Sequence, residues 1–289
     1  MIIKEINTRL RSLLKDSPDG EFDAMCIFED FIASRETLLT HPDSDIPEDK
    51  AALAISAAHK RLEGYPLQYI LGSWEFYGRT FRVGEGVLIP RPDTETLAEA
   101  ALDHAGRLYD GSPLIIADLC SGSGCIAVTL AKELGDRAKV YAVELSGDAI
   151  PYLMDNVRDN RADVTLIRGD VSNGHLLDNF VDANGEPMQI DMIVSNPPYL
   201  TEAEMNDLQR EVSFEPSEAL YGGTDGLNFY RVISCLWGER LRTGGMIAFE
   251  TGDRQAADVS QILRDSGFED ISVIQYAGLD RVVTARKKA

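Results

Sequence analysis

The sequence predicts an α/β protein in which a mainly parallel, Rossmann-like sheet of seven strands follows an N-terminal helical segment. Three observations predict this fold. From about residue 94, apolar strand patterns alternate with amphipathic helix patterns, which is typical of a sheet with helices on both faces. A glycine-containing turn follows the first of these strands. Earlier in the chain, the apolar residues recur instead with helical spacing.

Helical patterns occupy most of the first part of the chain. They cover about 2–16, 22–38 and 48–62. A polar, turn-rich break at 41–47 separates the last two, and Pro47 stands where the third helix should begin. We therefore expect three helices here.

A short hairpin is expected next. Aromatic and β-branched residues surround a glycine at 76–83, which favours two short strands joined by a turn. The change of pattern around this hairpin marks the expected domain junction. The expected organisation is a helical domain at 1–73, a hairpin linker at 74–93 and an α/β domain at 94–289.

The strands of the α/β part can be assigned one by one. They are expected at 114–119, 139–144, 163–168, 190–195, 245–250, 271–276 and 281–286. Amphipathic stretches at 124–134, 147–160, 226–241 and 254–265 separate most of them. The last two strands are too close in sequence for a parallel crossover, so they should form an antiparallel hairpin. A doubly wound sheet that ends this way points to the methyltransferase variant of the nucleotide-binding fold.

The charge of the chain argues against a nucleic-acid partner. The formal net charge is −20, and residues 1–73 contribute 8 basic and 13 acidic residues. Both parts are therefore acidic, whereas phosphate-binding surfaces normally carry a basic patch or stripe. We expect no direct nucleic-acid partner.

Targeting and redox features point to the cytoplasm. No apolar run approaches the roughly 18–20 residues of a membrane span, and the N-terminus is too charged for a signal peptide. The four cysteines, Cys26, Cys120, Cys125 and Cys235, form no CxxC pair, which fits reduced thiols. We expect a cytoplasmic monomer without a membrane partner or a bound metal.

A candidate cofactor turn follows the first strand of the sheet. Small residues at the carboxyl end of a central strand let a ligand approach the backbone closely, where open α/β sheets bind ligands. The residues of this turn are Asp118, Leu119, Cys120, Ser121, Gly122, Ser123 and Gly124. Glycines alone are a weak signal for nucleotide binding.

Two carboxylates at later strand ends strengthen the cofactor hypothesis. Glu144 ends the second strand, where an acidic side chain can accept hydrogen bonds from ribose hydroxyls. Asp170 follows the third strand and can accept from an adenine amino group. The third glycine of the dinucleotide fingerprint is absent, because Ala127 occupies its position. Without a diphosphate cradle, the pattern favours S-adenosylmethionine over NAD.

The most specific motif is Ser195-Asn196-Pro197-Pro198-Tyr199, directly after the fourth strand. An amide nitrogen or an exocyclic amine is a poor nucleophile because its lone pair is delocalised. Two acceptors, the Asn196 side-chain oxygen and the Pro197 carbonyl, can take both of its N–H groups and aim the lone pair at a methyl group. Tyr199 offers an aromatic face beside the planar group and the cationic sulfonium. The nitrogen becomes acidic only after the methyl has moved, so no general base is required.

At these motifs the sequence resembles the PrmC/HemK family of release factor glutamine methyltransferases, over nearly its whole length. Its interdomain segment is similar to 66–72 and 74–78, and the start of its catalytic domain to 87–95. Its substrate-side loop is similar to Phe214-Glu215-Pro216, Ala219-Leu220 and Gly222 to Leu227. Its fifth-strand region is similar to Gly244, Gly245, Glu250, Gly252 and Gln255.

The resemblance implies a class I methyltransferase domain behind a helical domain that grips the protein substrate. It implies methylation of the glutamine in the Gly-Gly-Gln motif of class I peptide chain release factors, which gives N5-methylglutamine and S-adenosylhomocysteine. By the same resemblance, residues 120–124 line the methionine part of S-adenosylmethionine, Glu144 its ribose, and Asp170 with Val171 its adenine. Asn196 to Tyr199 hold the glutamine amide, with Asn196 also beside the cofactor.

Two positions depart from the family pattern. The family usually has glycine at the position of Cys120 and often aspartate at the position of Glu144. Cys120 must therefore adopt a conformation that glycine takes more easily, and its thiol could be open to oxidation. Neither change removes an essential group.

Two alternatives stay open at the level of sequence. DNA adenine and ribosomal RNA guanine methyltransferases use a similar Asn-Pro-Pro-Tyr motif on planar amines, and only the acidic charge speaks against them. A non-catalytic adaptor could keep the fold and bind the cofactor for stability, although the intact Asn196 and Tyr199 speak against that.

Overall fold

The computed structural model describes residues 1–181 and 184–288. Residues 182, 183 and 289 of the expected α/β domain lie outside the described part. The chain divides into two compact units. The first consists of Met1–Ser73 with Gln209–Phe214, and the second of Trp74–Leu208 with Glu215–Ala289. The expected hairpin linker at 74–93 thus falls within the second unit.

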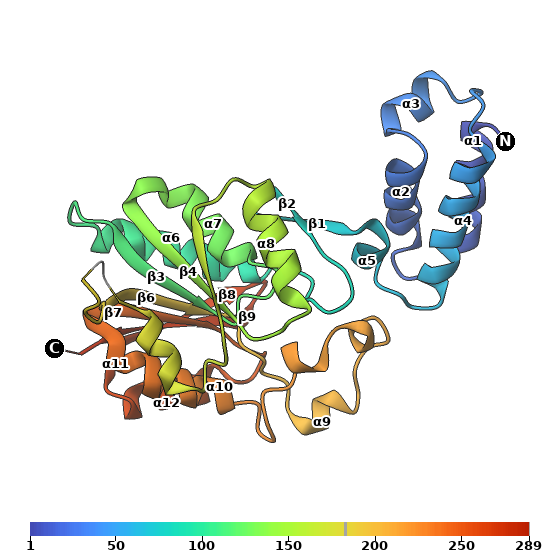
Figure 1. Ribbon diagram of the computed structural model, residues 1–289. Helices are drawn as coiled ribbons and strands as arrows, with labels where there is room; N and C mark the ends of the chain where they lie inside the picture. Colours follow the sequence, from blue (N-terminus) through green and yellow to red (C-terminus); the bar gives the residue numbers. More distant parts are fainter. Residues whose placement is uncertain (182–183, 289) are drawn as a thin grey trace. The chain divides into compact units, whose positions relative to one another are not determined.

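Helices build most of the first unit (Figure 1). They are α1 (Ile3–Leu14), α2 (Gly20–Phe31), α3 (Arg35–Thr40), α4 (Glu48–Leu62) and α5 (Leu67–Leu71). Their core consists of apolar side chains at helical spacing, such as Ile6, Leu10 and Leu14 of α1 and Ile27 and Phe28 of α2, all fully buried. The predicted helix at 22–38 is in fact two helices, because the chain breaks after Phe31 and Ser34 caps α3 by accepting from the Thr37 N–H.

A buried ion pair lies inside this helical unit. The Arg61 guanidinium on α4 donates to the Asp23 carboxylate on α2 over 2.7 Å, and both side chains are almost inaccessible. Arg61 also donates to Glu211 over 2.5 Å. The aromatic ring of Phe214 packs edge-on against that of Tyr65, with the ring centroids 5.2 Å apart. These contacts hold the segment Gln209–Phe214 in the helical unit, although it follows the Asn-Pro-Pro-Tyr motif in sequence.

The second unit begins with the expected hairpin and a helix that the sequence analysis did not assign. Strands β1 (Ser73–Phe76) and β2 (Arg79–Arg82) pair in a two-stranded sheet. Helix α6 (Thr94–Leu108) follows and buries an alanine-rich face. That face contains Leu97 but few other large apolar residues, so its periodicity was a weak signal in the sequence.

A seven-stranded sheet forms the centre of the second unit. Its strands are β3 (Leu114–Leu119), β4 (Ala138–Glu144), β5 (Val164–Arg168), β6 (Ile190–Ser195), β7 (Leu241–Glu250), β8 (Phe268–Tyr276) and β9 (Leu279–Lys287). Their spatial order is β5-β4-β3-β6-β7-β9-β8. All pairs are parallel except those of β9, which runs antiparallel to both β7 and β8. The fold class, the strand assignments and the terminal hairpin are therefore confirmed.

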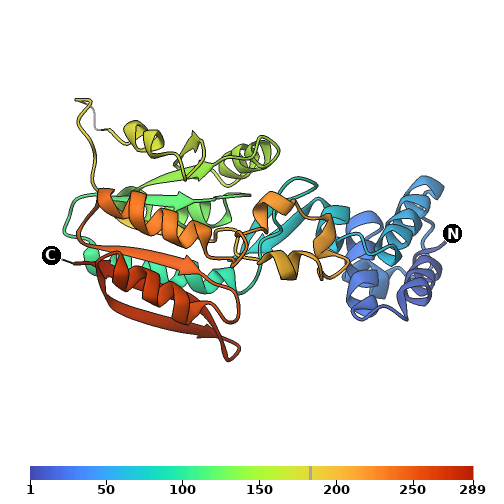
Figure 2. The ribbon, with the colours of Figure 1, turned by 90° about the horizontal axis from the view of Figure 1, so that it is seen from below.

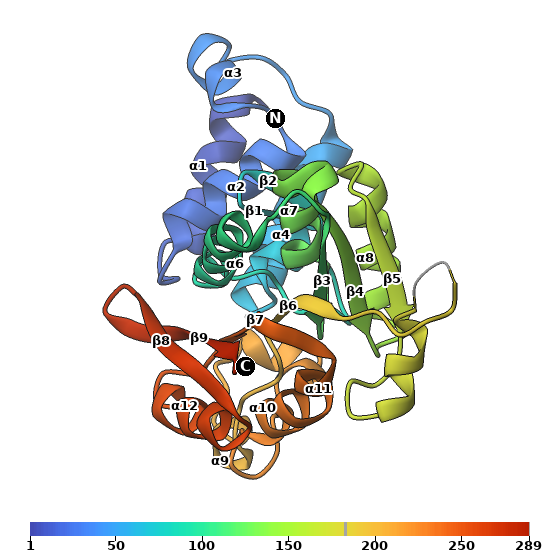
Figure 3. The ribbon, with the colours of Figure 1, turned by 90° about the vertical axis from the view of Figure 1, so that its left-hand side faces the viewer.

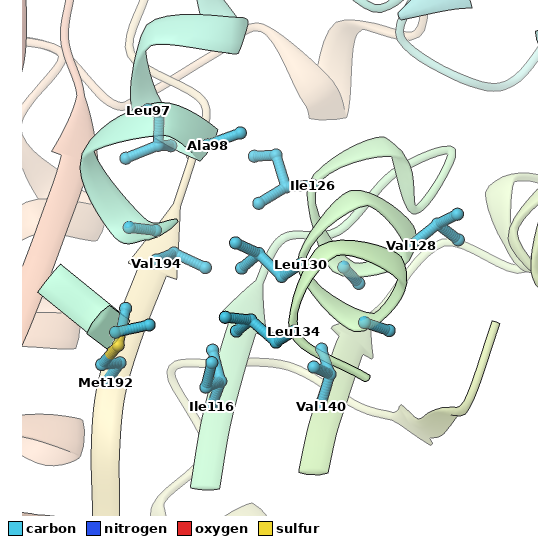
Figure 4. Close-up of a cluster of buried hydrophobic side chains, with 14 of the residues drawn as sticks. Leu97, Ala98, Ile116, Ile126, Val128, Leu130, Leu134, Val140, Met192 and Val194 are labelled. Carbon is cyan, nitrogen blue, oxygen red and sulfur yellow. The ribbon is translucent and has the colours of Figure 1, made fainter. Parts of the chain in front are cut away.

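Helices cover both faces of this sheet (Figure 3). Helices α6, α7 (Cys125–Leu134) and α8 (Ala149–Asp159) lie on one face. Figure 4 shows α6 and α7 side chains, among them Leu97 and Leu130, above β3, β4 and β6. Helices α10 (Asn228–Val232), α11 (Gly238–Arg240) and α12 (Ala256–Asp265) cover the other face (Figure 2). Within the described ranges, none of the helices is both long and apolar enough to cross a membrane.

Candidate active site

The turn after β3 is shaped by three left-handed backbone positions. Cys120, Gly122 and Gly124 have φ of 60°, 53° and 78°. Cys120 thus has the conformation that glycine takes more easily, at a cost of roughly 1–2 kcal/mol for a residue with a Cβ. Burial and the nearby Glu144 raise the pKa of the Cys120 thiol. The thiol therefore stays protonated, which disfavours the oxidation considered from the sequence.

Asp118 lies under this turn and is completely buried. Its Oδ2 accepts the Ala127 N–H over 3.1 Å at the start of α7, whereas Oδ1 has no hydrogen-bond partner among the residues described. Burial raises the pKa of Asp118 to about 8, and hydrogen bonds from Ser121 and Ala127 oppose the rise. An orphaned carboxylate oxygen in a buried site is suited to a ligand that brings a cation or an N–H donor.

Glu144 ties the end of β4 to the same turn. One of its oxygens accepts the Gly122 N–H and the other the Ser146 N–H, each over 2.7 Å. The side chain is largely buried, with 8% of its surface exposed. Each carboxylate oxygen can accept more than one hydrogen bond, so capacity for ligand hydroxyls remains. Glu144 is therefore both a clamp on the turn and a candidate acceptor.

Asp170 and Val171 follow β5. Asp170 is exposed, and its Oδ1 accepts the Ser172 N–H over 2.8 Å. The buried Val171 is fixed from behind, because the Trp237 indole N–H donates to its carbonyl over 2.9 Å. Trp237 ends a π-helical turn at Ile233–Trp237, and such turns are frequent at functional sites.

The Asn-Pro-Pro-Tyr motif leaves the carboxyl end of β6, beside the end of β3. Ser195 donates its hydroxyl to the Leu119 carbonyl over 2.6 Å. Asn196 donates from Nδ2 to the Thr94 hydroxyl over 3.4 Å. Because its Nδ2 is engaged in this way, Oδ1 is the amide atom available to accept an N–H from a substrate.

Two neighbours hold the far end of the motif. The Gln255 side-chain amide donates to the Tyr199 carbonyl over 2.8 Å. Gly222 packs so closely that a Cβ there would lie 2.6 Å from the Pro198 carbonyl oxygen. Only glycine fits this close approach. Burial raises the pKa of the Tyr199 phenol, so its ring is a neutral aromatic group.

The Phe-Glu-Pro motif is anchored to the segment before α6. The buried Glu215 carboxylate accepts the Ile89 N–H over 3.0 Å and forms an ion pair with Arg91. Arg91 is the one arginine that lines the main pocket of the described structure. Its guanidinium is engaged by the Glu215 carboxylate.

One pocket of about 930 Å³, open solvent at its mouth included, joins these parts. The predicted site residues that line it are Cys120, Ser121, Gly122, Ser123, Glu144, Asp170, Val171, Asn196 and Pro198. Asp118, Gly124, Pro197 and Tyr199 do not line it. Segments from elsewhere in the sequence also contribute, namely 86–91 and Thr94, and Pro216, Glu218 and Ala219. The glycine turn and the reactive motif thus share one cavity.

Several residues that lie around the site were given no role from the sequence. Asn156 and Trp237 were not singled out at all, whereas Thr94, Glu250 and Gln255 were only matched to the family's pattern. Asn156 is typical: its Nδ2 donates to the Ser123 carbonyl over 2.9 Å and its Oδ1 accepts the Arg82 N–H over 2.6 Å. A polar residue on the apolar side of an amphipathic helix was the available signal.

Comparison with solved structures agrees with the fold. A methyltransferase from Pyrococcus furiosus superposes with a TM-score of 0.52 at 15% identity, over 84% of this chain and 100% of the other. The hMettl16 catalytic domain, solved with an RNA hairpin, gives a TM-score of 0.54 at 14% identity, over 95% of this chain and 93% of the other. At such low identity these similarities establish the methyltransferase fold alone.

Sequence comparisons establish the family. A model of the PrmC N-terminal domain matches residues 5–72, and a model of the methyltransferase small domain matches residues 106–220. The release factor glutamine methyltransferase of Fusobacterium nucleatum is 37% identical over 93% of this chain and 74% of its own length. Those of Clostridium botulinum and Geobacter sulfurreducens are 36% and 42% identical, over 99% and 83% of this chain and 100% and 79% of their own lengths. The chain belongs to the family of release factor glutamine methyltransferases.

Proposed function

We propose that this protein transfers a methyl group from S-adenosylmethionine to the side-chain amide of the glutamine in the Gly-Gly-Gln motif of class I release factors. The observation that carries the proposal is the shared pocket, in which Asn196 and Pro198 meet the turn at Cys120–Ser123. An amide-binding motif and a cofactor turn in one cavity provide the arrangement that methyl transfer to nitrogen needs.

The residues of the pocket suit this cofactor chemically. S-adenosylmethionine supplies an electrophilic methyl group on a sulfonium cation, with an ammonium group, ribose hydroxyls and an adenine. Among the lining residues, Glu144 suits the ribose hydroxyls, and Asp170 and Val171 suit the adenine. Asp118 does not line the pocket and would support the turn from beneath. The Cys120–Gly124 turn would line the methionine part.

Asn196, Pro197 and Tyr199 would orient the substrate amide. The Asn196 Oδ1 and the Pro197 carbonyl would each accept one N–H, which fixes the plane of the amide and the direction of its lone pair. The neutral ring of Tyr199 would pack against this plane. Such positioning can supply a large part of the rate, since a reactant misplaced by 1 Å can react about 10²-fold more slowly.

The helical unit would hold the protein substrate. It contains none of the proposed chemical groups, and it displays exposed apolar side chains, among them Leu39 at 81% and Leu53 at 56% exposure. We further propose that the protein acts in the cytoplasm as a monomer and needs no nucleic acid.

The decisive experiment is methylation in vitro. Labelled S-adenosylmethionine should methylate a purified release factor, but not variants in which the motif glutamine is replaced by alanine or glutamate. Glutamate is the sharper control because a carboxylate has no N–H for the two acceptors and would be repelled by them. Transfer to the glutamate variant would contradict the proposed amide recognition.

Duplex DNA and ribosomal RNA test the competing nucleic-acid function in the same assay. A nucleic-acid enzyme with six to ten phosphate contacts would lose about 10³–10⁵ in affinity between 50 and 200 mM salt. We expect negligible binding of this acidic protein at either concentration. Salt-sensitive binding with methyl transfer would instead favour the nucleic-acid function.

Replacement of Glu144 tests the cofactor site. Glu144→Ala should weaken cofactor binding by about 1–3 kcal/mol, because ribose hydroxyls and two backbone N–H groups lose a charged acceptor. Turnover at saturating cofactor should largely recover. Calorimetric titration measures the affinity, and Glu133→Ala, a change of an exposed glutamate on α7, serves as the control. An unchanged affinity in Glu144→Ala would remove Glu144 from the cofactor site.

A further inference from the structure

The chain that leaves the Asn-Pro-Pro-Tyr motif is held by its main-chain atoms. The two prolines have no N–H groups, so they offer no main-chain donor to a neighbouring segment. The residue after the motif holds the chain instead. The Leu200 N–H donates to the Leu220 carbonyl, and the Leu200 carbonyl accepts the Gly222 N–H, each over 2.8 Å. The end of the motif is therefore paired with the start of the 222–227 loop.

Gln255, directly before α12, reaches the same junction with its side-chain amide. Its Nε2 donates to the Tyr199 carbonyl over 2.8 Å and to the Gly226 carbonyl over 3.3 Å. Its Oε1 accepts the Gly252 N–H over 3.0 Å. One side chain thus joins the end of the motif, the 222–227 loop and the turn after β7.

The partners of the Gln255 amide determine its orientation. Main-chain carbonyls only accept hydrogen bonds, so those of Tyr199 and Gly226 must meet the NH₂ group. A main-chain N–H only donates, so that of Gly252 must meet the oxygen. A side chain of the same shape with two carboxylate oxygens would therefore lose the bonds to Tyr199 and Gly226 and keep the bond to Gly252.

The 222–227 loop approaches Gln255 at a position that only glycine can occupy. A Cβ at Gly226 would lie 2.3 Å from the Tyr199 carbonyl oxygen and 2.5 Å from the Gln255 Nε2. The Gly226 φ of 72° is also in the left-handed region that glycine adopts most easily. Both features bring the main chain of the loop within hydrogen-bonding distance of Gln255.

The segments that Gln255 joins continue into the wall of the main pocket. Asn196 and Pro198 line the pocket from the motif. Residues within 216–219, before the loop, and Phe229, after it, line the pocket as well. Gln255 does not line the pocket, so it would act on a substrate only through these segments.

We propose that Gln255 is a positioning residue that joins the Asn-Pro-Pro-Tyr motif to the 222–227 loop through the two donors of its amide. The inference rests on the proposed function, because that function assigns the motif to the substrate glutamine. With both donors in place, the Pro197 carbonyl and the Tyr199 ring keep their positions relative to the pocket wall. Without them the motif can shift, and a reactant misplaced by about 1 Å can react about 10²-fold more slowly.

The first test uses the free protein and does not depend on its activity. Gln255→Glu keeps the shape of the side chain and the acceptor for Gly252, but loses both donors. We expect the amide hydrogens of Leu200 and Gly222 to exchange about tenfold faster, as for the loss of one buried hydrogen bond. The amide hydrogens of β3 and β6 should exchange as in the wild type. Unchanged exchange at Leu200 and Gly222 would overturn the inference.

Activity gives the second test. Wild-type methylation of a release factor is measured first, and its absence would contradict the proposed function while the exchange result still decides whether Gln255 joins the two segments. At saturating substrates, Gln255→Glu should lower the single-turnover rate about tenfold and leave the affinity for the cofactor within about threefold. A wild-type rate, or an equal loss of cofactor affinity, would overturn the inference.

Gln261→Glu on α12 is the matched control. The Gln261 side-chain amide donates to the Asp265 carboxylate over 2.8 Å on the exposed side of the helix. The chemical change is the same, and we expect wild-type exchange and a wild-type rate. An equal loss of rate in this variant would mean that an added charge on α12 lowers the rate, which would overturn the assignment of Gln255.

Gly226→Ala disturbs the same contact from the side of the loop. Its Cβ would displace the Gln255 amide, so we expect a loss of rate of about tenfold or more. Adding Gln255→Glu should then lower the rate by less than about threefold further, because both changes remove one contact. Losses that multiply in the double variant would overturn the inference.

Gly267→Ala is the control for the glycine variant. Gly267 has a φ of 82°, and apart from its chain neighbours no atom of the described residues lies within 4 Å of a Cβ built there. The backbone strain of an added Cβ is therefore similar, but the contact with Gln255 is untouched. We expect the wild-type rate. A loss equal to that of Gly226→Ala would assign the effect to strain and would overturn the inference.

Discussion

Asn196→Ala is expected to lower turnover by at least 10²-fold while the affinity for the cofactor changes by less than tenfold. The side-chain oxygen is proposed to hold one N–H of the acceptor amide, and its loss leaves the amide held by the Pro197 carbonyl alone. Small misplacements of a reactant have effects of this size. Single-turnover rates and calorimetric titration of S-adenosylmethionine separate the two quantities.

The matched control for this variant is Asn160→Ala at the end of α8. The Asn160 amide donates to the Thr80 carbonyl over 3.2 Å and does not line the pocket. It should therefore keep the wild-type rate. A rate of Asn196→Ala within about threefold of the wild type would show that the acceptor amide is held by other groups.

Arg61→Ala is expected to destabilise the helical unit by about 3–5 kcal/mol, because it leaves the buried carboxylate of Asp23 without its counter-ion. Burial already raises the pKa of Asp23, and the Arg61 guanidinium opposes this rise. Without Arg61 the pKa should rise further, so acidification should narrow the difference in stability between the variant and the wild type. Hydrogen exchange of the α1, α2 and α4 amides at two pH values measures this difference in the stability of the helical unit.

Arg35→Ala provides the control within the same unit. Arg35 pairs with Glu29, but both side chains are largely exposed, and such pairs contribute about 0–1 kcal/mol. If the helical unit holds the release factor, Arg61→Ala should also raise the KM for the release factor. The KM for a short peptide that contains the glutamine should stay the same. If Arg61→Ala and Arg35→Ala change amide hydrogen exchange equally, the buried Arg61–Asp23 pair is not a main source of stability of the helical unit.

The sequence predicted the elements whose pattern is strong. The seven strands were recognisable from apolar runs such as Leu114–Leu119, and the terminal hairpin followed from the short connection after Tyr276. Helix α6 was missed because its buried face is mostly alanine, which gives little contrast between the two faces. The break after Phe31 was missed because a serine cap resembles many other polar positions in a sequence.

The candidate site was predicted as a set of strand-end residues, and nine of these line one pocket. Their roles in binding remain predictions. The residues that support the site, such as Thr94 and Trp237, could not be found from positions at strand ends. Thr94 reaches Asn196 only because the folded chain brings the start of α6 to the end of β6. Trp237 reaches Val171 through a π-helical turn, which no residue type or spacing announces.

The segment Gln209–Phe214 affects how the helical unit can be exchanged between related proteins by recombination. This unit consists of two stretches of sequence that are separated by the 135 residues 74–208. The Arg61–Glu211 hydrogen bond joins the two stretches. Recombination between relatives at residue 73 would therefore exchange only part of it. Arg61, Asp23 and Glu211 should vary together among relatives, and a chimaera should fold well only if residues 209–214 accompany the first 73.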